Sequence, residues 1–364
     1  MNRTQIAVAL IAITATSAAT LYYFNFYQET SPEQHILKIY CAGSLLYPME
    51  QVAEAFMEQY PDITVQIEGH GSIQVIRHPV ELNDPADLLM VADYSLIPIM
   101  MYKAPLPDGS GNFTDWYIRF AGNELVLAYT NQSLYKDELT SKNWYTILAR
   151  PDVKLGISNP IIDALGYRGL QVLQLAEYYC GEPQIFETVI GTWFDPEIKT
   201  VEVDEKTAIF VPEVEDPNED KISMRASSIQ IMPLLETGAL DYSFLYKSNA
   251  EQHGLNYLTL PNEINMGNPD YDTYYAKAQV KFQHQRFQSI GLDRYGKTIY
   301  YGLTIPETAE NPEDAVLMIA FILGGEGKTI FEELDHSVYM PAYADNIGGV
   351  PEELKQYLTT DYYK

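Results

Sequence analysis

The fold is decided by residues 37–72, which read LKIYCAGSLLYPMEQVAEAFMEQYPDITVQIEGHGS. Apolar residues alternate over residues 37–41 and again over residues 65–67, as they do in strands. Between these segments, apolar side chains recur at helical spacing. Each predicted strand runs into a Gly-Ser pair, at residues 43–44 and 71–72. The stretch therefore predicts strand, helix, strand and the start of a second helix.

The two Gly-Ser turns predict an anion-binding site. Glycine lets the backbone approach a ligand, serine is common where helices begin, and the first N–H groups of a helix lack intrahelical partners. The positive end of the helix dipole adds to this, so such a turn can bind an anion. Open α/β sheets bind ligands at the carboxyl ends of their strands, so we expect Ser44 and Ser72 to lie close together.

The charge balance excludes several classes of partner. The 364 residues, enough for two domains, include 23 Lys and Arg against 50 Asp and Glu, a formal net charge of -27. This charge argues against nucleic acid and anionic membrane surfaces as partners. It would also repel an anionic ligand, so an anion site must rely on local neutral N–H and O–H donors.

No cofactor or metal signature is present in the sequence. The two cysteines, Cys41 and Cys180, do not indicate a disulfide framework, and the six histidines show no ligand spacing typical of zinc. Walker-type and dinucleotide-binding glycine patterns are also absent from the sequence. We therefore expect a protein without a resident cofactor.

The N-terminal sequence predicts export. Residues 6–24 are uncharged and mostly apolar and follow Arg3, the layout of a signal peptide or membrane anchor. Small residues at 16–19 fit a cleavage site, whereas the aromatic run at 21–27 is typical of a membrane interface and slightly favours an anchor. We expect residues 1–35 to be a signal peptide or anchor plus linker. The protein is then extracytoplasmic, at the outer face of the cell membrane.

The rest of the chain predicts a two-lobed α/β protein with largely parallel sheets. Residues 124–130 are strand-like and long enough to pass from one lobe to another, and a second α/β pattern follows them. The acidic stretch 181–221 is interpreted as a solvated surface excursion. The predicted organisation assigns residues 36–127 and 262–364 to lobe one and residues 128–261 to lobe two.

Several motifs then follow one another in an order that resembles a known family. They are YCAGSL at residues 40–45, GHGS at 69–72, VADYSLIP at 91–98, GYR at 166–168, DY at 241–242, YKS at 246–248 and EQHGL at 251–255. Over residues 36–355 the chain resembles the archaeal-type tungstate/molybdate-binding proteins of ABC importers. The resemblance implies a periplasmic-binding-protein fold (type II) whose lobes close on one oxyanion. It also implies a monomer that delivers tungstate or molybdate to an ABC transporter permease in the membrane.

The resemblance implies a set of ligand-binding residues. Ser44 and Leu45 match the first oxyanion-binding turn and Ser72 the second, whereas the Asp163 carboxylate approaches the metal of the bound oxyanion. Tyr246 matches a hydroxyl donor. The full set is Ser44, Leu45, Ser72, Asp163, Ala164, Leu165, Ser228 and Tyr246.

Ser228 is a departure from the family pattern. Such proteins usually carry a glutamate at this position as the second carboxylate that approaches the metal. A serine cannot supply a carboxylate oxygen. The chain therefore lacks one of the two carboxylates used in the six-oxygen coordination known for the family. We expect a tetrahedral anion held by hydrogen bonds.

The same residues allow other interpretations. The fold could bind sulfate, phosphate or an organic anion, and a tethered oxyanion sensor is possible in principle, although no second module follows Lys364. A serine hydrolase would need His70 to act as the base for Ser72, and no Gly-x-Ser-x-Gly sequence is present. We therefore expect no enzyme activity. Asp93 is interpreted as a helix cap, and Arg168 as a residue that braces the site.

Overall fold

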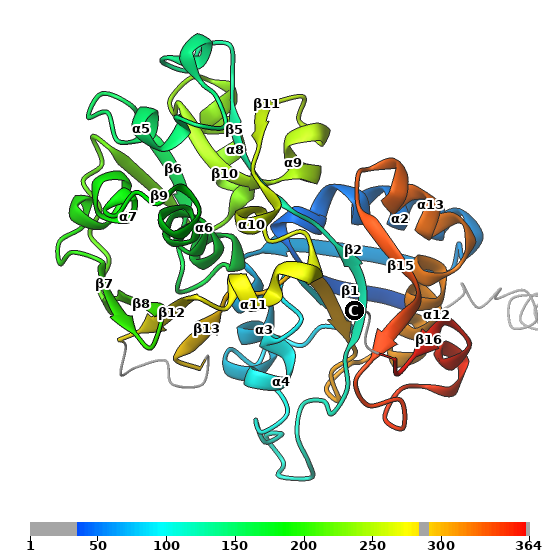
Figure 1. The fold of residues 1–364 in the computed structure, drawn as a ribbon. Coiled ribbons are helices and arrows are strands. Elements are labelled where there is room, and N and C mark those ends of the chain that lie inside the picture. The colour runs from blue at the N-terminus through cyan, green and yellow to red at the C-terminus, as the bar shows by residue number, and fades with distance from the viewer. Residues whose placement is uncertain (1–34, 284–290, 362–364) are drawn as a thin grey trace, which may run out of the picture.

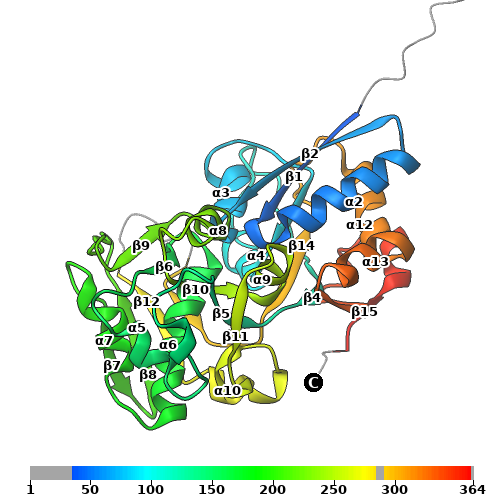
Figure 2. The same cartoon turned by 90° about the horizontal axis from the view of Figure 1, so that it is seen from above.

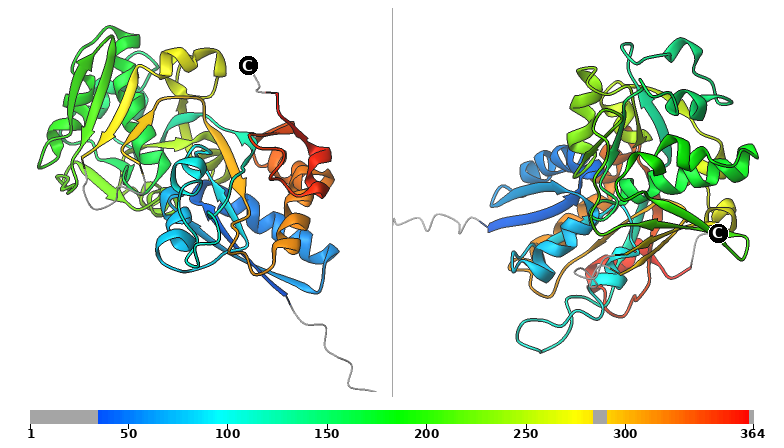
Figure 3. Two further views of the ribbon diagram at one scale, coloured as in Figure 1. Left: turned by 90° about the horizontal axis from the view of Figure 1, so that it is seen from below. Right: turned by 90° about the vertical axis from the view of Figure 1, so that its left-hand side faces the viewer.

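The computed structural model describes residues 35–283 and 291–361, which form two lobes, each built on its own sheet (Figure 1). Figure 3 shows the lobe of residues coloured green and yellow beside the lobe that contains both the blue and the red ends. One sheet has the strand order β16-β15-β4-β14-β3-β1-β2 and the other has the order β11-β5-β10-β6-β9. The predicted two-lobed α/β class is confirmed.

The first lobe is built around the strand pair that the opening stretch predicts. β1 pairs in parallel with β2 and β3, whereas β14 pairs antiparallel with β3, so the sheet is mixed and not largely parallel. Its strands are β1 (His35–Ala42), β2 (Ile63–His70), β3 (Leu88–Val91), β4 (Ile118–Gly122), β14 (Tyr300–Thr304), β15 (Ser337–Ala344) and β16 (Leu358–Thr359). Its helices are η1 (Gly43–Leu45), α2 (Leu46–Gln59), α3 (Ser72–Glu81), α4 (Leu96–Met100), α12 (Pro312–Leu323), α13 (Gly325–Glu333) and η6 (Glu352–Tyr357).

The second lobe is organised around a buried helix. Every residue of α6 (Ala164–Cys180) from Ala164 to Ala176 is buried, because the helix packs on β6 and β10 on one side and on β12 on another. The strands of the five-stranded sheet are β5 (Leu125–Tyr129), β6 (Leu155–Ser158), β9 (Ile222–Arg225), β10 (Tyr242–Tyr246) and β11 (Asn256–Thr259). The other helices are η2 (Lys136–Glu138), α5 (Trp144–Leu148), α7 (Ile185–Val189), η3 (Gly191–Trp193), α8 (Ser228–Glu236), α9 (Lys247–Gln252), α10 (Asn262–Asn265), η4 (Pro269–Tyr271) and α11 (Asp272–Tyr275).

A third sheet corrects the interpretation of residues 181–221 as a surface excursion. β7 (Lys199–Val203) and β8 (Lys206–Val211) form a four-stranded sheet with β12 (Ala278–Phe282) and β13 (Asp293–Tyr295), in the order β13-β12-β8-β7. Ile209 and Val211 of β8 are buried, and β8 pairs in parallel with β12. Most acidic residues of this region lie in loops, with Glu202 on the exposed β7 and Glu187 on α7, and they obscured the strand pattern in the sequence.

The predicted lobe boundaries remain a prediction. The strand pairings add two observations about them. β5 begins at Leu125 and pairs with β10, so the passage between the two large sheets is short, at Asn123 and Glu124. β12 and β13 lie within the range predicted for lobe one, yet β12 pairs with β8. In the described ranges no helix is long and apolar enough to cross a membrane, and the predicted span at residues 6–24 lies outside those ranges.

Candidate ligand-binding site

The first predicted turn lies where the two lobes meet. Gly43 begins η1, which continues into α2, and α8 of the second lobe packs against it. A Cβ atom on Gly43 would lie 2.9 Å from Cγ1 of Ile229 and 3.2 Å from Oγ of Ser228, so only glycine allows this approach. The contact places Ser228, the first residue of α8, beside the turn that carries Ser44. Figure 2 shows α8 and α9 at the boundary between the lobes.

The second predicted turn meets the other lobe in the same way. A Cβ atom on Gly71 would lie 2.4 Å from the carbonyl oxygen of Ile162 and 3.0 Å from Cβ of Asp163. The N–H of Ile73, in the first turn of α3, donates a hydrogen bond to the Ile162 carbonyl (3.2 Å). Asp163, which precedes α6, is therefore held next to Ser72, which begins α3.

A buried arginine joins Tyr246 to the first lobe. Nη1 of Arg168 donates to the hydroxyl of Tyr246 (2.7 Å) and to the carbonyl of Ala92 (2.8 Å), the residue after β3. The Ala92 N–H in turn donates to Oγ of Ser72 (3.0 Å). Arg168 thus joins Tyr246 of the second lobe to Ala92 of the first, and the backbone of Ala92 in turn contacts the turn of Ser72.

All eight predicted site residues are enclosed. None is more than 5% exposed, so the side chains of the set are withdrawn from solvent in this closed arrangement. Four helices of at least nine residues, α2, α3, α6 and α8, have their N-termini at or next to these residues. Hydroxyl groups and helix N–H groups are donors, and together they suit an anion.

Asp163 is the acidic member of the set. Burial raises the pKa of its carboxyl to about 6, although the nearby Ser158 hydroxyl and the N–H groups of Ser72 and Leu165 oppose the shift. Ser158 ends β6, and its side chain is buried. A carboxyl in this position repels an anion when it is ionised and can donate a hydrogen bond when it is protonated.

A buried charge cluster lies behind the site and was not predicted. Asp93 accepts from the Tyr167 hydroxyl (2.7 Å), and its other oxygen lies 3.0 Å from Nζ of Lys297. Burial alone would raise the pKa of Asp93, but the charges of Lys297 and Arg168 hold it well below its usual range. The two cations outnumber the one carboxylate, so the cluster adds positive potential behind the candidate site. Asp93 also accepts from the N–H and hydroxyl of Ser95, but Ser95 is the residue at the start of α4, so the prediction that Asp93 caps this helix is wrong.

Two further polar residues support Ser44. The Tyr301 hydroxyl donates to Oγ of Ser44 (3.1 Å), and Nδ2 of Asn123 donates to the Tyr301 hydroxyl (3.0 Å). Burial raises the pKa of Tyr301 to about 12, so the hydroxyl stays protonated at neutral pH. Sequence patterns could not assign Tyr301 to the site, because it is 257 positions from Ser44.

The hydrolase alternative finds no support in the position of His70. Its ring lies against those of Tyr40 and His78, and Nε2 is 3.5 Å from a carboxylate oxygen of Glu68. Ser72 instead accepts the Ala92 N–H. Within the described ranges, no group of three or more His, Cys, Asp or Glu residues is arranged to hold a metal ion.

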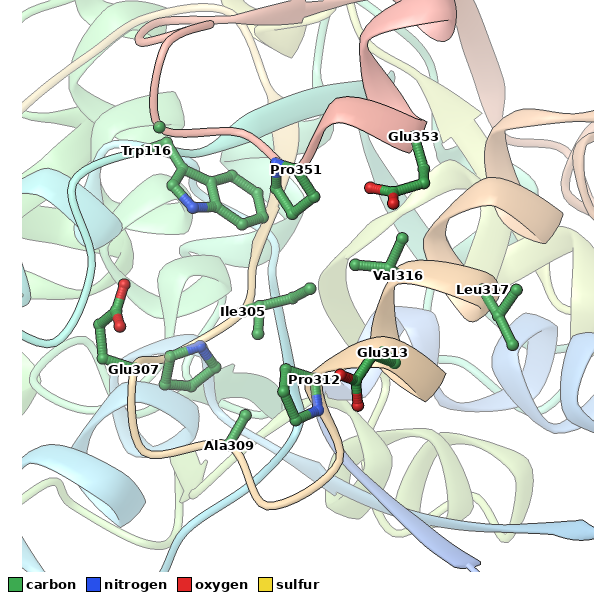
Figure 4. Close-up of a pocket in the computed structure, with 12 residues that line it drawn as sticks. Trp116, Ile305, Glu307, Ala309, Pro312, Glu313, Val316, Leu317, Pro351 and Glu353 are labelled. Atoms are coloured by element: carbon green, nitrogen blue, oxygen red, sulfur yellow. The ribbon is translucent and has the colours of Figure 1, made fainter.

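A surface pocket of about 550 Å³ lies elsewhere on the first lobe (Figure 4). Trp116, Ile305 and Pro351 face it, and Glu307 and Glu353 add carboxylates to its lining. Ile305 follows β14, which runs antiparallel to β3. The pocket therefore lies at one end of the strands and the predicted site at the other end. Its apolar walls and carboxylates do not suit an anion.

The chain belongs to the family of bacterial extracellular solute-binding proteins, which it matches over residues 37–333. It is 38% identical over 335 residues to the molybdate/tungstate-binding protein WtpA of Pyrococcus abyssi, covering 90% of this chain and 91% of the relative. An uncharacterized solute-binding protein of Methanococcus maripaludis is 39% identical over 336 residues, 91% of this chain and 90% of the relative. These relatives confirm the resemblance stated from the motifs.

A solved structure shows the same fold. The periplasmic molybdate-binding protein of Azotobacter vinelandii superposes with a TM-score of 0.52 at 16% identity, covering 83% of this chain and 99% of that chain. At this identity the likeness is one of fold.

Proposed function

We propose that this protein is the solute-binding component of an ABC importer and captures tungstate or molybdate for delivery to a membrane permease. The observation that carries the proposal is that Ser44, Ser72, Ser228 and Tyr246 are buried where the two lobes meet, close to the N-termini of four helices. The names of relatives that bind molybdate and tungstate support the choice of anion.

Neutral donors are sufficient for such a site. A hydrogen bond to a charged group contributes about 1.5–3 kcal/mol, so about six donors offset much of the dehydration of a dianion. Arg168 lies behind Tyr246, and its Nη1 donates to protein oxygens on both lobes. Size and geometry, more than net charge, then select the ligand.

Asp163 and Ser228 bear on the choice among oxyanions. A carboxylate beside a dianion is tolerable where one of its oxygens bonds partially to a large metal centre that can expand its coordination, as tungsten and molybdenum can and sulfur cannot. With Ser228 in the other position, the chain has one such carboxylate. We propose a preference for tungstate or molybdate that is less sharp than in relatives with glutamate there.

Calorimetry of the purified full chain with tungstate, molybdate, sulfate and phosphate tests the proposal. We expect one-to-one binding, with tungstate or molybdate tighter than sulfate. Tighter binding of sulfate or phosphate would support the alternative in which the same fold serves another oxyanion. Binding of none of the four would contradict an oxyanion site.

We further propose that the segment before residue 36 holds the protein at the outer face of the membrane. The uncharged run at residues 6–24 is about long enough to span the hydrocarbon core as a helix. Membrane fractionation after expression in an archaeal or bacterial host is the test. A full-length, uncleaved chain found in the cytosol would contradict it.

A further inference from the structure

Ile229, the second residue of α8, packs into a socket formed by two glycines of the other lobe. A Cβ atom on Gly43 would lie 2.9 Å from Cγ1 of Ile229, and a Cβ atom on Gly69 would lie 2.7 Å from its Cδ1. Gly43 follows β1 and Gly69 lies near the end of β2, and these two strands pair with each other. The contact therefore joins α8 of the second lobe to both strands that run into the Gly-Ser turns.

The two glycines provide space and not a special backbone conformation. Neither Gly43 nor Gly69 has a positive φ, so other residues could adopt the same backbone. Cβ atoms essentially never come within 3.0 Å of another atom, so a side chain at either position would have to displace Ile229. What the glycines supply is room for one apolar side chain from the other lobe.

Ile229 lies at the boundary between the candidate site and solvent. Ser228, which precedes it, is 2% exposed and approaches Gly43, whereas Gln230, which follows it, is exposed. Ile229 itself is half-buried, so the first turn of α8 passes from the enclosed site to the surface at this residue. An apolar side chain seated there keeps water away from the donors of the site. Hydrogen bonds and charge interactions are stronger where water is excluded.

We infer that Ile229, Gly43 and Gly69 form an apolar seal between the lobes, and that Ile229 is a positioning residue that sets how long a bound anion stays. The inference rests on the proposed function and adds the rate of release to it. The seal is apolar and offers no hydrogen bond, so it should slow the release of every oxyanion alike. The choice among anions stays with the polar residues of the site.

Ile229→Ala empties the socket and is the first test. We expect tungstate to be released about tenfold faster and bound about tenfold more weakly, the scale of a half-buried aliphatic side chain. The association rate and the ratio of tungstate to sulfate affinity should stay unchanged, because differences between related complexes lie mostly in the release rate. Release of radiolabelled tungstate into an excess of unlabelled anion measures the rate, and calorimetry measures the affinities.

Gly69→Ala tests the same contact from the first lobe. The new methyl group would meet Cδ1 of Ile229, and this β-branched side chain can avoid it only by turning out of the socket. We expect a loss of tungstate affinity of about tenfold. Small-angle scattering with saturating tungstate should also show a larger radius of gyration than for the wild type. In the Ile229→Ala background, Gly69→Ala should cost no further affinity, because the methyl group then enters the emptied socket.

Leu46 is the other side chain that the new methyl group would meet. Its Cδ2 would lie 3.0 Å from a Cβ atom on Gly69, and it belongs to the same lobe as Gly69. An effect that acts through Leu46 would persist in full in the Ile229→Ala background, and this result would overturn the seal. Gly325→Ala is the matched control, since Gly325 is an exposed glycine of the first lobe with nothing within 4 Å of its Cβ position. It should change neither the affinity nor the release rate.

The outcomes separate this inference from the proposed function. Wild-type protein that binds no tetrahedral oxyanion overturns the proposed function. Wild-type protein that binds tungstate, with a release rate that Ile229→Ala leaves unchanged, overturns the seal alone. A changed ratio of tungstate to sulfate affinity in Ile229→Ala would show that this residue selects the anion and would also overturn the seal. Ile229 is half-buried, so Ile229→Ala tests the seal even if Gly69→Ala does not fold.

Discussion

The proposed ligand site has two walls, one from each lobe, and they differ in what they offer an anion. The wall from the first lobe presents Ser44 and Ser72, which are neutral donors at the starts of η1 and α3. The wall from the second lobe presents the donors Ser228 and Tyr246 and also Asp163, an acid whose burial raises its pKa to about 6. We expect the first wall to accept any tetrahedral anion. The choice among anions should therefore lie in the second wall.

Removing donors from both walls should have the largest effect. The triple variant Ser44→Ala, Ser72→Ala and Tyr246→Phe loses three hydrogen bonds to the ligand. At about 1.5 kcal/mol or more for each, tungstate affinity should fall at least about a thousandfold. Calorimetry measures this loss, and thermal unfolding checks that the variant folds. Unchanged binding would mean that the ligand lies elsewhere.

A single change in the first wall should affect all anions alike. Ser72→Ala removes one donor and should weaken binding by about 1–3 kcal/mol for tungstate and sulfate together. Titration of both anions into this variant is the measurement. A loss of affinity for only one of the two anions would show that the first wall also discriminates between anions and would contradict this prediction.

Changes in the second wall should alter the ratio of affinities. Ser228→Glu supplies a second carboxylate and should widen the ratio of tungstate to sulfate affinity, whereas Asp163→Ala should narrow it, each by about tenfold, the scale of one such contact. Competition titrations of the wild type and both variants compare these ratios. If Ser228→Glu abolishes tungstate binding, or Asp163→Ala improves both anions equally, Asp163 acts as a helix cap and not as a metal contact.

Only some residues of the candidate site could be predicted from the sequence. Ser44 and Ser72 could be predicted as neighbours of the two turns because strand, turn and helix lie within a short stretch of the sequence. Tyr301, Asn123 and Lys297 could not, because their contacts join segments far apart in the chain. Residues 181–221 were misinterpreted because charged loops outweighed the apolar residues of β8.

An effect on stability is expected without ligand. The pKa of Asp163 is about 6 in the folded protein, whereas an unperturbed aspartate has a pKa of about 3.9. Between these two pH values the folded state therefore binds more protons than the unfolded state. The contribution of Asp163 to stability is complete below pH ~4 and is lost as the pH rises through about 6. Asp163→Asn should therefore exceed the wild type in stability above that pH, by about 2–3 kcal/mol.

Denaturant unfolding of both proteins across this pH range measures the difference. Asp137→Asn changes a carboxyl that is 90% exposed and serves as the control, for which the difference should stay flat. A wild-type protein as stable as Asp163→Asn at every pH would show that the Asp163 carboxyl is not penalised by burial.

The most direct test of the central claim is a crystal structure of the protein grown with tungstate, in which the anomalous scattering of tungsten locates the ion. The account predicts one peak enclosed by Ser44, Ser72, Ser228 and Tyr246, with an Asp163 oxygen facing the metal. A peak in another part of the molecule, such as the pocket beside Trp116, or no bound tungsten at all, would contradict it.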